Sequence, residues 1–297
     1  MINYSIIIPH KNTPELLRKC LDSIPRRDDI QIIVVDDNSD ADKVDFEHFP
    51  GLGEPHTEVY FTKEGRGAGY ARNVGLEHAI GKWILFLDSD DFFHECVSEL
   101  MDKCIDNGAD VVFFKADSIN LADGTDGYRG DEFSSRVDIA IRDNNYQPVL
   151  MYSCPIGKVI SFDFLKKNGI KFNEVRYGND VVFMAKVALY SEKYDAVDLT
   201  AYCISISNGS LTRTKNADSC LIRLRQDLEG AAYYKKKFEL SETDKFWYFE
   251  TWKNMYICDK SIASKYLSDI CEVVGIKIFA KNYFKLLKRR IKSLLKK

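Results

Sequence analysis

The sequence predicts an α/β protein with a mostly parallel, Rossmann-like sheet, because short apolar runs alternate along the chain with segments of helical periodicity. Four runs have the length and composition of buried strands: 4–9, 30–35, 58–62 and 83–87. A helix is expected after the first run, where Thr13 and Pro14 form a start signal, and another after the third. Since parallel neighbours require crossover connections, this alternation favours a doubly wound sheet.

Acidic clusters follow two of these strands. The fourth strand gives way to Asp88-Ser89-Asp90-Asp91 and the second to Asp36-Asp37-Asn38-Ser39-Asp40. Neighbouring carboxylates repel one another unless a cation or hydrogen-bond donors neutralise them, and Mg²⁺ and Mn²⁺ prefer oxygen ligands. Ligands of such sheets bind at the carboxyl ends of the strands, where both clusters and the loop at Asn12 would meet. A cation carrying a phosphate fits this edge; for either cluster alone, the alternative is an acidic turn that caps a helix.

The middle of the chain is less regular. Helices are expected at 95–107 and 161–168 and strands at 111–114 and 194–206, whereas 117–150 has weak periodicity and is predicted to be irregular. Asp180 opens an apolar helix over 181–190, where the helix dipole favours an ionised carboxylate. The polar loop 208–213 suits either closure over a phosphate or a plain turn. From 216 onward the pattern is helical, and its many aromatic residues are interpreted as core between helices.

Composition limits the classes of protein. Hydrophobic residues make up 45% and charged residues 29% of the 297 residues, as in an ordinary globular protein. The eight cysteines occur singly, without histidines at zinc-ligand spacing, so most are expected to be reduced core residues. The sequence begins without a signal segment and has no run long enough to span a membrane, which predicts a cytoplasmic protein. A dinucleotide-binding oxidoreductase is disfavoured because the turn after the first strand lacks glycine.

Five motifs in fixed order are specific when taken together. They are Ser5-Ile6-Ile7-Ile8-Pro9-His10-Lys11-Asn12, Val34-Val35-Asp36-Asp37-Asn38-Ser39, Gly69-Tyr70-Ala71-Arg72-Asn73-Val74-Gly75, Phe86-Leu87-Asp88-Ser89-Asp90-Asp91 and Asn179-Asp180-Val181-Val182-Phe183. Over residues 1 to about 213, they resemble the family 2 glycosyltransferases of the GT-A fold, the group that builds bacterial surface polysaccharides. The resemblance implies a GT-A nucleotide-diphospho-sugar transferase fold with a C-terminal helical extension.

The resemblance also assigns nucleotide-binding residues. It implies that Asp37 reads the nucleotide base, usually uracil, and that Pro9 and Asn12 line the same pocket. It places Arg72 beside the nucleotide and its phosphates. The family often has an aromatic residue where this chain has Lys11, which weakens base stacking there and favours a phosphate contact.

The same resemblance assigns the reacting end of the site. Asp88 and Asp90 form the Asp-x-Asp signature, in which Asp90 would bind a divalent metal, Mn²⁺ or Mg²⁺, that bridges the donor diphosphate. Asp91 is left outside the signature and is expected to cap a helix. Asp180 matches the general base, which must be unprotonated to take the acceptor's proton.

Two departures from the family pattern bear on the acceptor side. Asn179 stands where the family usually has Glu, so Asp180 rests on spacing, and Glu174 is the alternative base. Lys158 matches a Lys in a motif that usually opens with Trp, and Ile156 replaces that Trp. Acceptor specificity is therefore weakly constrained.

The end of the chain is strongly basic. Residues 277–297 hold nine Lys or Arg and no Asp or Glu, so the net charge of −3 leaves −12 for the rest. Apolar residues recur every three or four positions over 276–297, which suits either an anionic membrane face or a helix packed on its own domain. Nucleic acid is an unfavourable partner for the acidic remainder. We expect a catalytic domain over 1–213, with a nucleotide-binding half to about 115 and an acceptor half from about 116, and a helical region over 214–297.

The predicted function is inverting transfer of a sugar from a nucleoside-diphosphate donor, usually UDP-linked, to a hydroxyl of a saccharide or lipid-linked acceptor in polysaccharide biosynthesis. The alternatives are a sugar nucleotidyltransferase, whose glycine-rich turn should follow the first strand, and a non-catalytic membrane-peripheral binding module. The predicted location is the cytoplasm, with peripheral contact at the inner face of the cell membrane as a further option.

Overall fold

The computed structural model describes residues 1–206 and 214–294, with side chains as far as Lys288. The chain divides into two compact units, Met1–Ser210 and Leu211–Lys297. The predicted polar loop 208–213 and the side chains of the last basic residues lie outside the described residues.

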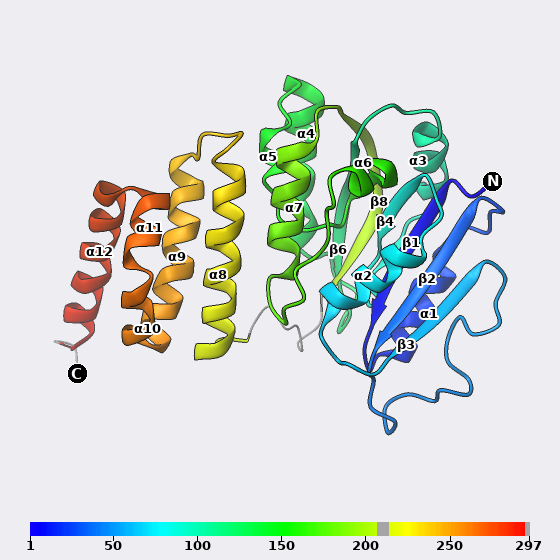
Figure 1. The fold of residues 1–297 in the computed structure, drawn as a ribbon, viewed down its shortest axis with the longest axis horizontal. Coiled ribbons are helices and arrows are strands. Elements are labelled where there is room, and N and C mark those ends of the chain that lie inside the picture. Colours follow the sequence, from blue (N-terminus) through cyan, green and yellow to red (C-terminus); the bar gives the residue numbers. More distant parts are fainter. Residues whose placement is uncertain (207–213, 295–297) are drawn as a thin grey trace. The chain divides into compact units, whose positions relative to one another are not determined.

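The first unit is built on one mixed sheet (Figure 1). Within the described residues the strand order is β3-β2-β1-β4-β7-β6-β8-β5. The strands are β1 (Tyr4–His10), β2 (Ile30–Asp37), β3 (Thr57–Thr62), β4 (Trp83–Phe86), β5 (Phe92–Phe93), β6 (Val111–Asn120), β7 (Lys158–Ser161) and β8 (Tyr194–Ile206). Every residue of β1 and β4 is buried, as the continuous apolar runs predict.

The sheet has a parallel half and a mixed half. Strands β3, β2, β1 and β4 pair in parallel, and so do β6 and β8. Strand β7 runs antiparallel between β4 and β6, and β5 runs antiparallel along β8. The expectation of a mostly parallel sheet is confirmed, but β5 and β7 were not predicted, because both are too short to show periodicity.

The helices of this unit include two in the stretch that was predicted to be irregular. They are α1 (Pro14–Asp22), α2 (Ala68–His78), α3 (Val97–Cys104), α4 (Arg129–Asp143), α5 (Gln147–Leu150), α6 (Phe162–Lys167) and α7 (Asn179–Tyr190). The prediction that 117–150 is irregular was wrong, because β6 continues to Asn120 and α4 follows it. Helix α4 buries Phe133, Val137 and Ala140, whose helical spacing is masked by the polar residues between them.

The second unit is entirely helical where it is described, with α8 (Ala217–Tyr234), α9 (Glu242–Cys258), α10 (Lys260–Lys265), α11 (Leu267–Val274) and α12 (Ile276–Leu294). Capping boxes at Asn216 and Ser241 start α8 and α9. Trp252 of α9 contacts Phe279 and Tyr283 of α12. The aromatic residues therefore form a core between helices, as expected, and one face of the basic helix α12 packs on its own unit.

Candidate active site

The carboxyl ends of β1, β2 and β4 meet at one edge of the sheet. His10 is in register with Asp36, and the N–H of Leu87 donates to the carbonyl of Ile7 over 3.1 Å. Because β1 lies between β2 and β4, both acidic clusters emerge beside the loop that follows β1. The two clusters and the Asn12 loop thus share an edge, as predicted.

Asp36 is part of the scaffold. Its Oδ2 lies 2.7 Å from Nδ1 of His10 and accepts a 2.5 Å hydrogen bond from the hydroxyl of Ser39. Nε2 of His10 accepts from the N–H of Thr13, which assigns the ring proton to Nδ1. Burial raises the pKa of Asp36, but the hydrogen bonds from His10 and Ser39 outweigh it and hold the pKa below its ordinary value. This carboxylate is therefore ionised, and its oxygens are occupied by hydrogen bonds within the protein.

One of the two carboxylate oxygens of Asp37 has no hydrogen-bond partner. Its Oδ2 accepts from the N–H of Gly67 over 2.8 Å, whereas its Oδ1 is buried without a hydrogen-bond partner. Nζ of Lys11 donates to the carbonyl of Asp37 over 2.9 Å and lies 3.9 Å from Oδ2. Burial raises the pKa of Asp37, opposed by Gly67 and Lys11. A buried acceptor without a donor is costly, so Asp37 is prepared for a ligand N–H.

Asn12 joins the loops after β1 and β2. Nδ2 of Asn12 donates to Oδ2 of Asp40 over 2.9 Å, and the backbone N–H of Asp40 donates to Oδ1 of Asn12 over 2.8 Å. Its backbone adopts φ of +59°, which Asn tolerates better than most residues. Pro9 is buried in β1, in register with Val35. In this structure Asn12 shapes the edge of the predicted base pocket.

Arg72 connects the two predicted ends of the site. Its guanidinium is buried and donates to Oδ1 of Asp88 over 2.5 Å and to Oδ1 of Asn179 over 3.0 Å. Its Nε is buried without a partner. Cζ of the guanidinium lies over the ring of Phe172, 5.3 Å from the ring centroid. Arg72 thus fixes the Asp-x-Asp segment to the start of α7.

Asp90 is a carboxylate under electrostatic strain. Burial and the neighbouring Asp88 raise its pKa to about 6. Among the described residues no side-chain donor hydrogen-bonds to it, in contrast to Asp88, which Arg72 binds. A divalent cation would relieve the repulsion between these two oxygen-rich side chains.

Asp91 does not cap a helix, so that prediction was wrong. Helix α3 starts after Cys96 without a side-chain cap, and Asp91 is buried beside β8. Its Oδ2 accepts from the hydroxyl of Tyr202 over 2.6 Å and its Oδ1 from the N–H of Ser205 over 2.7 Å. The same hydroxyl accepts from the N–H of Asp88 over 3.2 Å. Tyr202 therefore holds the acidic turn in place, and the sequence gives no signal for a partner so far along the chain.

Asp180 is the second residue of α7, as expected from its position before the apolar run. Burial raises its pKa, while Arg72 and the N–H groups at the helix start act to lower it. The helix start alone does not set its charge, because desolvation outweighs that effect. The alternative base, Glu174, is bound to Arg66 at 2.9 Å and by the amide of Asn73 at 3.3 Å.

Gly69 explains why α2 and α7 approach so closely. A Cβ at this position would lie 2.5 Å from the carbonyl oxygen of Asn173 and 2.8 Å from Cβ of Asn179. Only glycine leaves room there. The close approach brings Arg72, one turn further along α2, to Asn179 and so beside Asp180.

Lys158 is a buried lysine near Asp180. Its ammonium donates to the carbonyl oxygens of Cys154 and Ile156 over 2.6 and 3.2 Å and lies 4.6 Å from the ring centre of Phe133. Desolvation lowers its pKa to about 8, although Cys154 and Asp180 act to raise it. Lys158 thus holds the segment 154–157, and its position near Asp180 places that segment at the site.

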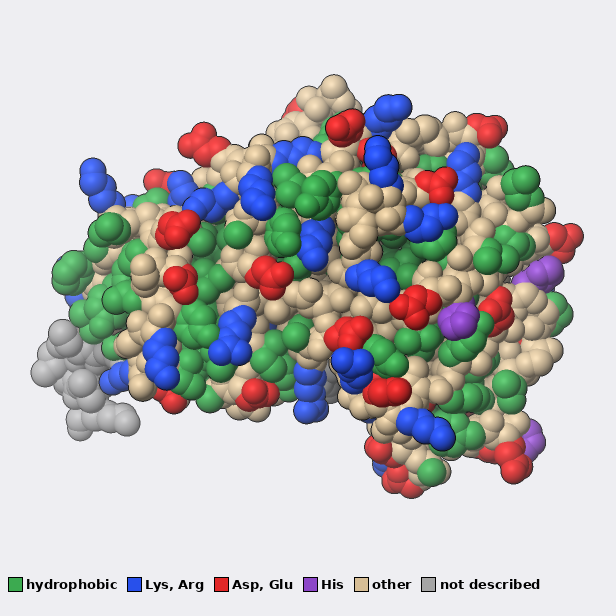
Figure 2. Space-filling view, in the orientation of Figure 1, with side chains coloured by type: hydrophobic (Ala, Val, Ile, Leu, Met, Phe, Trp, Pro, Cys, Tyr) green, Lys and Arg blue, Asp and Glu red, His purple; other side chains and the backbone are tan. Residues whose placement is uncertain are grey.

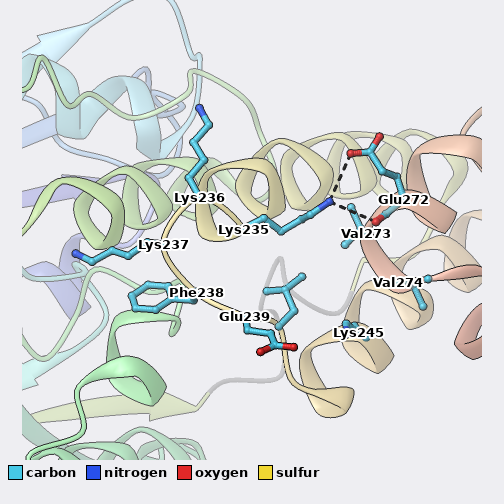
Figure 3. A pocket seen from close by; sticks show the side chains of 11 residues that line it. Lys235, Lys236, Lys237, Phe238, Glu239, Lys245, Glu272, Val273 and Val274 are labelled. Carbon is cyan, nitrogen blue, oxygen red and sulfur yellow. Dashed lines mark hydrogen bonds and ion pairs between the residues drawn. The ribbon is translucent and has the colours of Figure 1, made fainter.

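A pocket in the second unit contains none of the predicted site residues (Figure 3). It is lined by Lys235, Lys236, Lys237, Phe238, Glu239, Leu240, Lys245, Glu272, Val273, Val274 and Gly275. Nζ of Lys235 bridges its wall to the carbonyl oxygen of Glu272 over 3.3 Å. The chemistry predicted from the sequence therefore lies on the sheet of the first unit.

Comparison with known proteins defines the class. Residues 5–169 match the family described as Glycosyl transferase family 2. This match covers more than half of the chain, and the chain belongs to glycosyl transferase family 2. The resemblance inferred from the five motifs is confirmed.

Two relatives are informative. Glycosyltransferase GlyA of Streptococcus pneumoniae is 31% identical over 221 residues, covering 70% of this chain and 31% of that protein. Poly(ribitol-phosphate) beta-N-acetylglucosaminyltransferase TarS of Staphylococcus aureus (strain MW2) is 25% identical over 209 residues, covering 68% of this chain and 35% of that protein. The matched stretch thus spans about a third of the length of these relatives.

Solved structures confirm the GT-A architecture. The crystal structure of S. aureus TarS 1–349 matches with a TM-score of 0.67 at 18% identity, covering 93% of this chain and 82% of that one. The same segment in complex with UDP-GlcNAc gives 0.63 at 17% identity, with coverage of 96% and 92%. Mannosyltransferase PcManGT from Pyrobaculum calidifontis, in complex with GDP-Man and Mn²⁺, gives 0.56 at 14% identity, with coverage of 96% and 79%. Within the part of the chain that the structure describes, no helix is long and apolar enough to cross a bilayer.

Proposed function

We propose that this chain is an inverting, metal-dependent glycosyltransferase that moves a sugar from a UDP-linked donor to a hydroxyl of a saccharide or lipid-linked acceptor in polysaccharide biosynthesis. The observation that carries the proposal is the pair of hydrogen bonds from Arg72 to Asp88 and Asn179. They join Asp88, at the predicted diphosphate end, to Asn179, which precedes the predicted general base Asp180. The UDP-GlcNAc complex and the poly(ribitol-phosphate) acceptor named for TarS support the choice of donor and polymer.

The nucleotide base binds at Asp37 in this proposal. Oδ1 of Asp37 is a buried acceptor without a donor, and the imide N–H of uracil supplies one. Pro9 and Asn12 lie on the neighbouring strand end, where they bound the same pocket. Lys11, whose Nζ donates to the carbonyl of Asp37, is proposed to contact the donor phosphates.

Asp90, with Asp88, suits a divalent cation. The donor set is carboxylate oxygen, which Mg²⁺ and Mn²⁺ prefer; burial and Asp88 raise the pKa of Asp90, and a cation there would offset the repulsion between the two carboxylates. The Mn²⁺ reported with PcManGT supports the same choice. When bound, such a cation offsets the charge that develops on the departing nucleoside diphosphate. Arg72 supplies a fixed positive charge beside it.

Asp180 takes the proton of the acceptor hydroxyl. As the acceptor oxygen bonds to the anomeric carbon, the bond from that carbon to the diphosphate oxygen breaks, and the proton passes to the carboxylate of Asp180. A single displacement inverts the anomeric configuration. Arg72 acts to lower the pKa of Asp180 against the larger effect of burial, which favours the unprotonated form that a base needs.

Ligand-induced stabilisation tests the donor site. We expect UDP with Mn²⁺ to raise the melting temperature of the wild type and Asp90→Ala to lose that shift. Asp106→Ala is the matched control, since Asp106 is an exposed carboxylate on the same unit, and it should retain the shift. No shift with any nucleoside diphosphate would refute the proposal.

A second assay separates binding from chemistry. Asp180→Asn should bind UDP with Mn²⁺ as the wild type does but lose at least about 100-fold of the transfer rate. Pyrophosphate release from a nucleoside triphosphate and a sugar phosphate would instead identify a sugar nucleotidyltransferase. Binding without donor hydrolysis or transfer would identify a non-catalytic module.

Helix α12 is proposed to contact an anionic membrane from the cytoplasmic side. Lys277, Lys281 and Lys288 are exposed on one face with Phe284, while Phe279 packs inward. In Figure 2, Lys and Arg side chains over the helical unit are interspersed with Asp and Glu, so the visible face is mixed in charge. Co-sedimentation with phosphatidylglycerol vesicles, reduced in Lys277→Glu/Lys281→Glu, tests this; equal binding to neutral vesicles would contradict it.

A further inference from the structure

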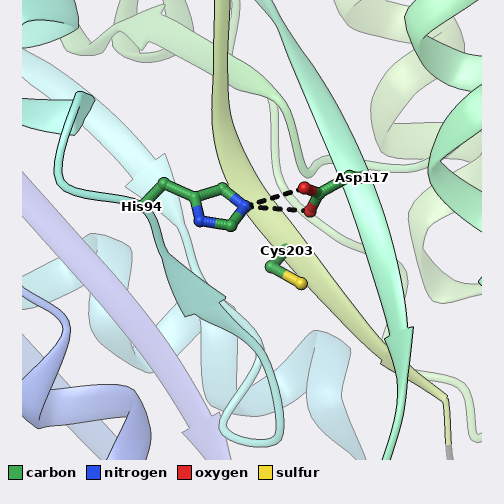
Figure 4. A group of neighbouring side chains, drawn as sticks. All are labelled: His94, Asp117 and Cys203. Atoms are coloured by element: carbon green, nitrogen blue, oxygen red, sulfur yellow. Dashed lines mark hydrogen bonds and ion pairs between the residues drawn. The ribbon is translucent and has the colours of Figure 1, made fainter. Parts of the chain in front are cut away.

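A second cluster of metal-ligating side chains lies on the mixed half of the sheet, apart from the Asp-x-Asp segment. It consists of His94, Asp117 and Cys203, contributed by the segment after β5, by β6 and by β8 (Figure 4). The imidazole nitrogen, carboxylate oxygen and thiol sulfur all lie within 4.8 Å of one another. These are the three ligand types that Zn²⁺ takes in proteins.

Strand pairing brings the cluster together. Asp117 is in register with Cys203 across the parallel pair β6–β8, and Cys203 is in register with Phe92 across the antiparallel pair β8–β5. The ladder continues past β5, because the N–H of His94 donates to the carbonyl of Ala201 over 3.1 Å. Side chains two residues apart on a strand share a face, so the three side chains project on one side of the sheet.

The polar groups of the cluster converge on a single point. Nε2 of His94 lies 2.9 and 3.0 Å from the two carboxylate oxygens of Asp117, and the thiol sulfur of Cys203 lies within 4.8 Å of both groups. A divalent cation placed there would displace the thiol proton and bind Nε2 of a neutral imidazole whose proton is on Nδ1.

The dimensions suit a small tetrahedral ion. Ligand atoms about 2.0–2.3 Å from zinc lie roughly 3.3–3.8 Å from one another, so shifts of about 1 Å bring the present atoms to bonding distance. The side chains of His94 and Asp117 are 36% and 48% exposed, which gives an ion access, while Cys203 is buried at the base. Water would complete the coordination.

We propose that His94, Asp117 and Cys203 form a binding site for a zinc-type divalent metal. The ion joins β5, β8 and β6 and so secures the strand that carries Tyr202. Tyr202 points to the opposite face of β8 from Cys203 and holds Asp91 and the N–H of Asp88. The site is therefore a structural metal site behind the acidic turn, and it does not depend on the proposed transferase activity.

Cobalt substitution tests the site directly in the full chain. Metal-free protein titrated with Co²⁺ should develop a thiolate-to-cobalt charge-transfer band at one equivalent, and Zn²⁺ should displace it. The band should disappear in Cys203→Ser and weaken in His94→Gln and Asp117→Asn, with Zn²⁺ affinity reduced at least about tenfold. His94→Gln and Asp117→Asn alter exposed side chains, so they remain informative if Cys203→Ser is poorly folded.

Two control variants distinguish this site from other places in the chain where a metal could bind. Cys258→Ser removes the exposed thiol that lies 3.5 Å from Cys220, and it should keep the band. Asp90→Ala removes the proposed donor metal and should also keep it. Zn²⁺ should raise the melting temperature of the wild type but not of Cys203→Ser. The proposal is overturned if the wild type shows no thiolate band at stoichiometric Co²⁺, or if the band persists unchanged in His94→Gln and Asp117→Asn.

Discussion

The guanidinium of Arg72 and the carboxylate of Asp88 form a 2.5 Å ion pair in which Arg72 is buried and Asp88 about one third exposed, at 35% of its side chain. Arg72→Met would leave Asp88 beside Asp90 without its cation. We expect the free energy of unfolding to fall by about 2 kcal/mol, less than for a fully buried pair because solvent screens Asp88. Urea denaturation measures this. Arg142→Met, which breaks the exposed pair with Asp143, should leave stability nearly unchanged.

Tyr202→Phe should loosen the acidic turn. It removes the hydroxyl that donates to Asp91 and accepts from the N–H of Asp88, and it leaves both groups without that partner. We expect a loss of about 1–3 kcal/mol in unfolding free energy and weaker UDP–Mn²⁺ binding by calorimetry. The matched control is Tyr128→Phe, an exposed tyrosine, which should leave both quantities unchanged. Unchanged nucleotide affinity in a destabilised Tyr202→Phe would show that the turn is ordered by other contacts.

Asp90→Asn should stabilise the metal-free protein while removing function. Burial raises the folded-state pKa of Asp90 to about 6 from 3.8, so the folded state binds its proton more tightly than the unfolded state. The stability due to that proton is fully present below about pH 4 and is lost as the pH rises through about 6. At pH 7.5 the asparagine variant should gain about 1–3 kcal/mol in EDTA, and this gain should vanish near pH 4. Thermal unfolding across this pH range measures it, and a gain that does not vary with pH would contradict the assignment.

Gly69→Ala should separate the helices that carry Arg72 and Asp180. The added methyl group meets the carbonyl oxygen of Asn173 and the Cβ of Asn179, so α2 or α7 must move. Overpacking of this kind costs about 1–3 kcal/mol, and misplacement of the base lowers kcat more than it raises KM for the donor. Steady-state kinetics provides the measurement. Gly108→Ala adds its methyl group in open space and should behave as the wild type.

The sequence predicts the structure best where a short stretch of neighbouring residues decides it. The continuous apolar runs of β1, β2 and β4 predict burial on both sides, and their acidic ends predict the shared edge. Asp180 at a helix start followed from the apolar run after it. These features are local, so neighbouring residues suffice to predict them.

Features that depend on distant pairing were missed. Strand β7 is four residues long and exists because β4 and β6 flank it, and α4 is a helix whose apolar positions are separated by polar ones. The same reason explains Asp91, which looked like a cap but pairs with Tyr202 more than a hundred residues later. The rule that zinc ligands cluster in sequence also cannot detect His94, Asp117 and Cys203, since only strand order joins them.

The antiparallel strand β7 has a consequence for exchanging parts of this chain. Three registered pairs between β4 and β7 join a parallel half that carries Asp37, Arg72 and Asp88 to the mixed half. The segment 121–157, which contains α4 and α5, connects two neighbouring strands, β6 and β7. In the proposed function this segment belongs to the acceptor half, so exchanging it would alter the accepted polymer and leave Asp37, Arg72 and Asp88 in place. A chimaera that receives 121–157 from a relative should keep its nucleotide preference and change its acceptor.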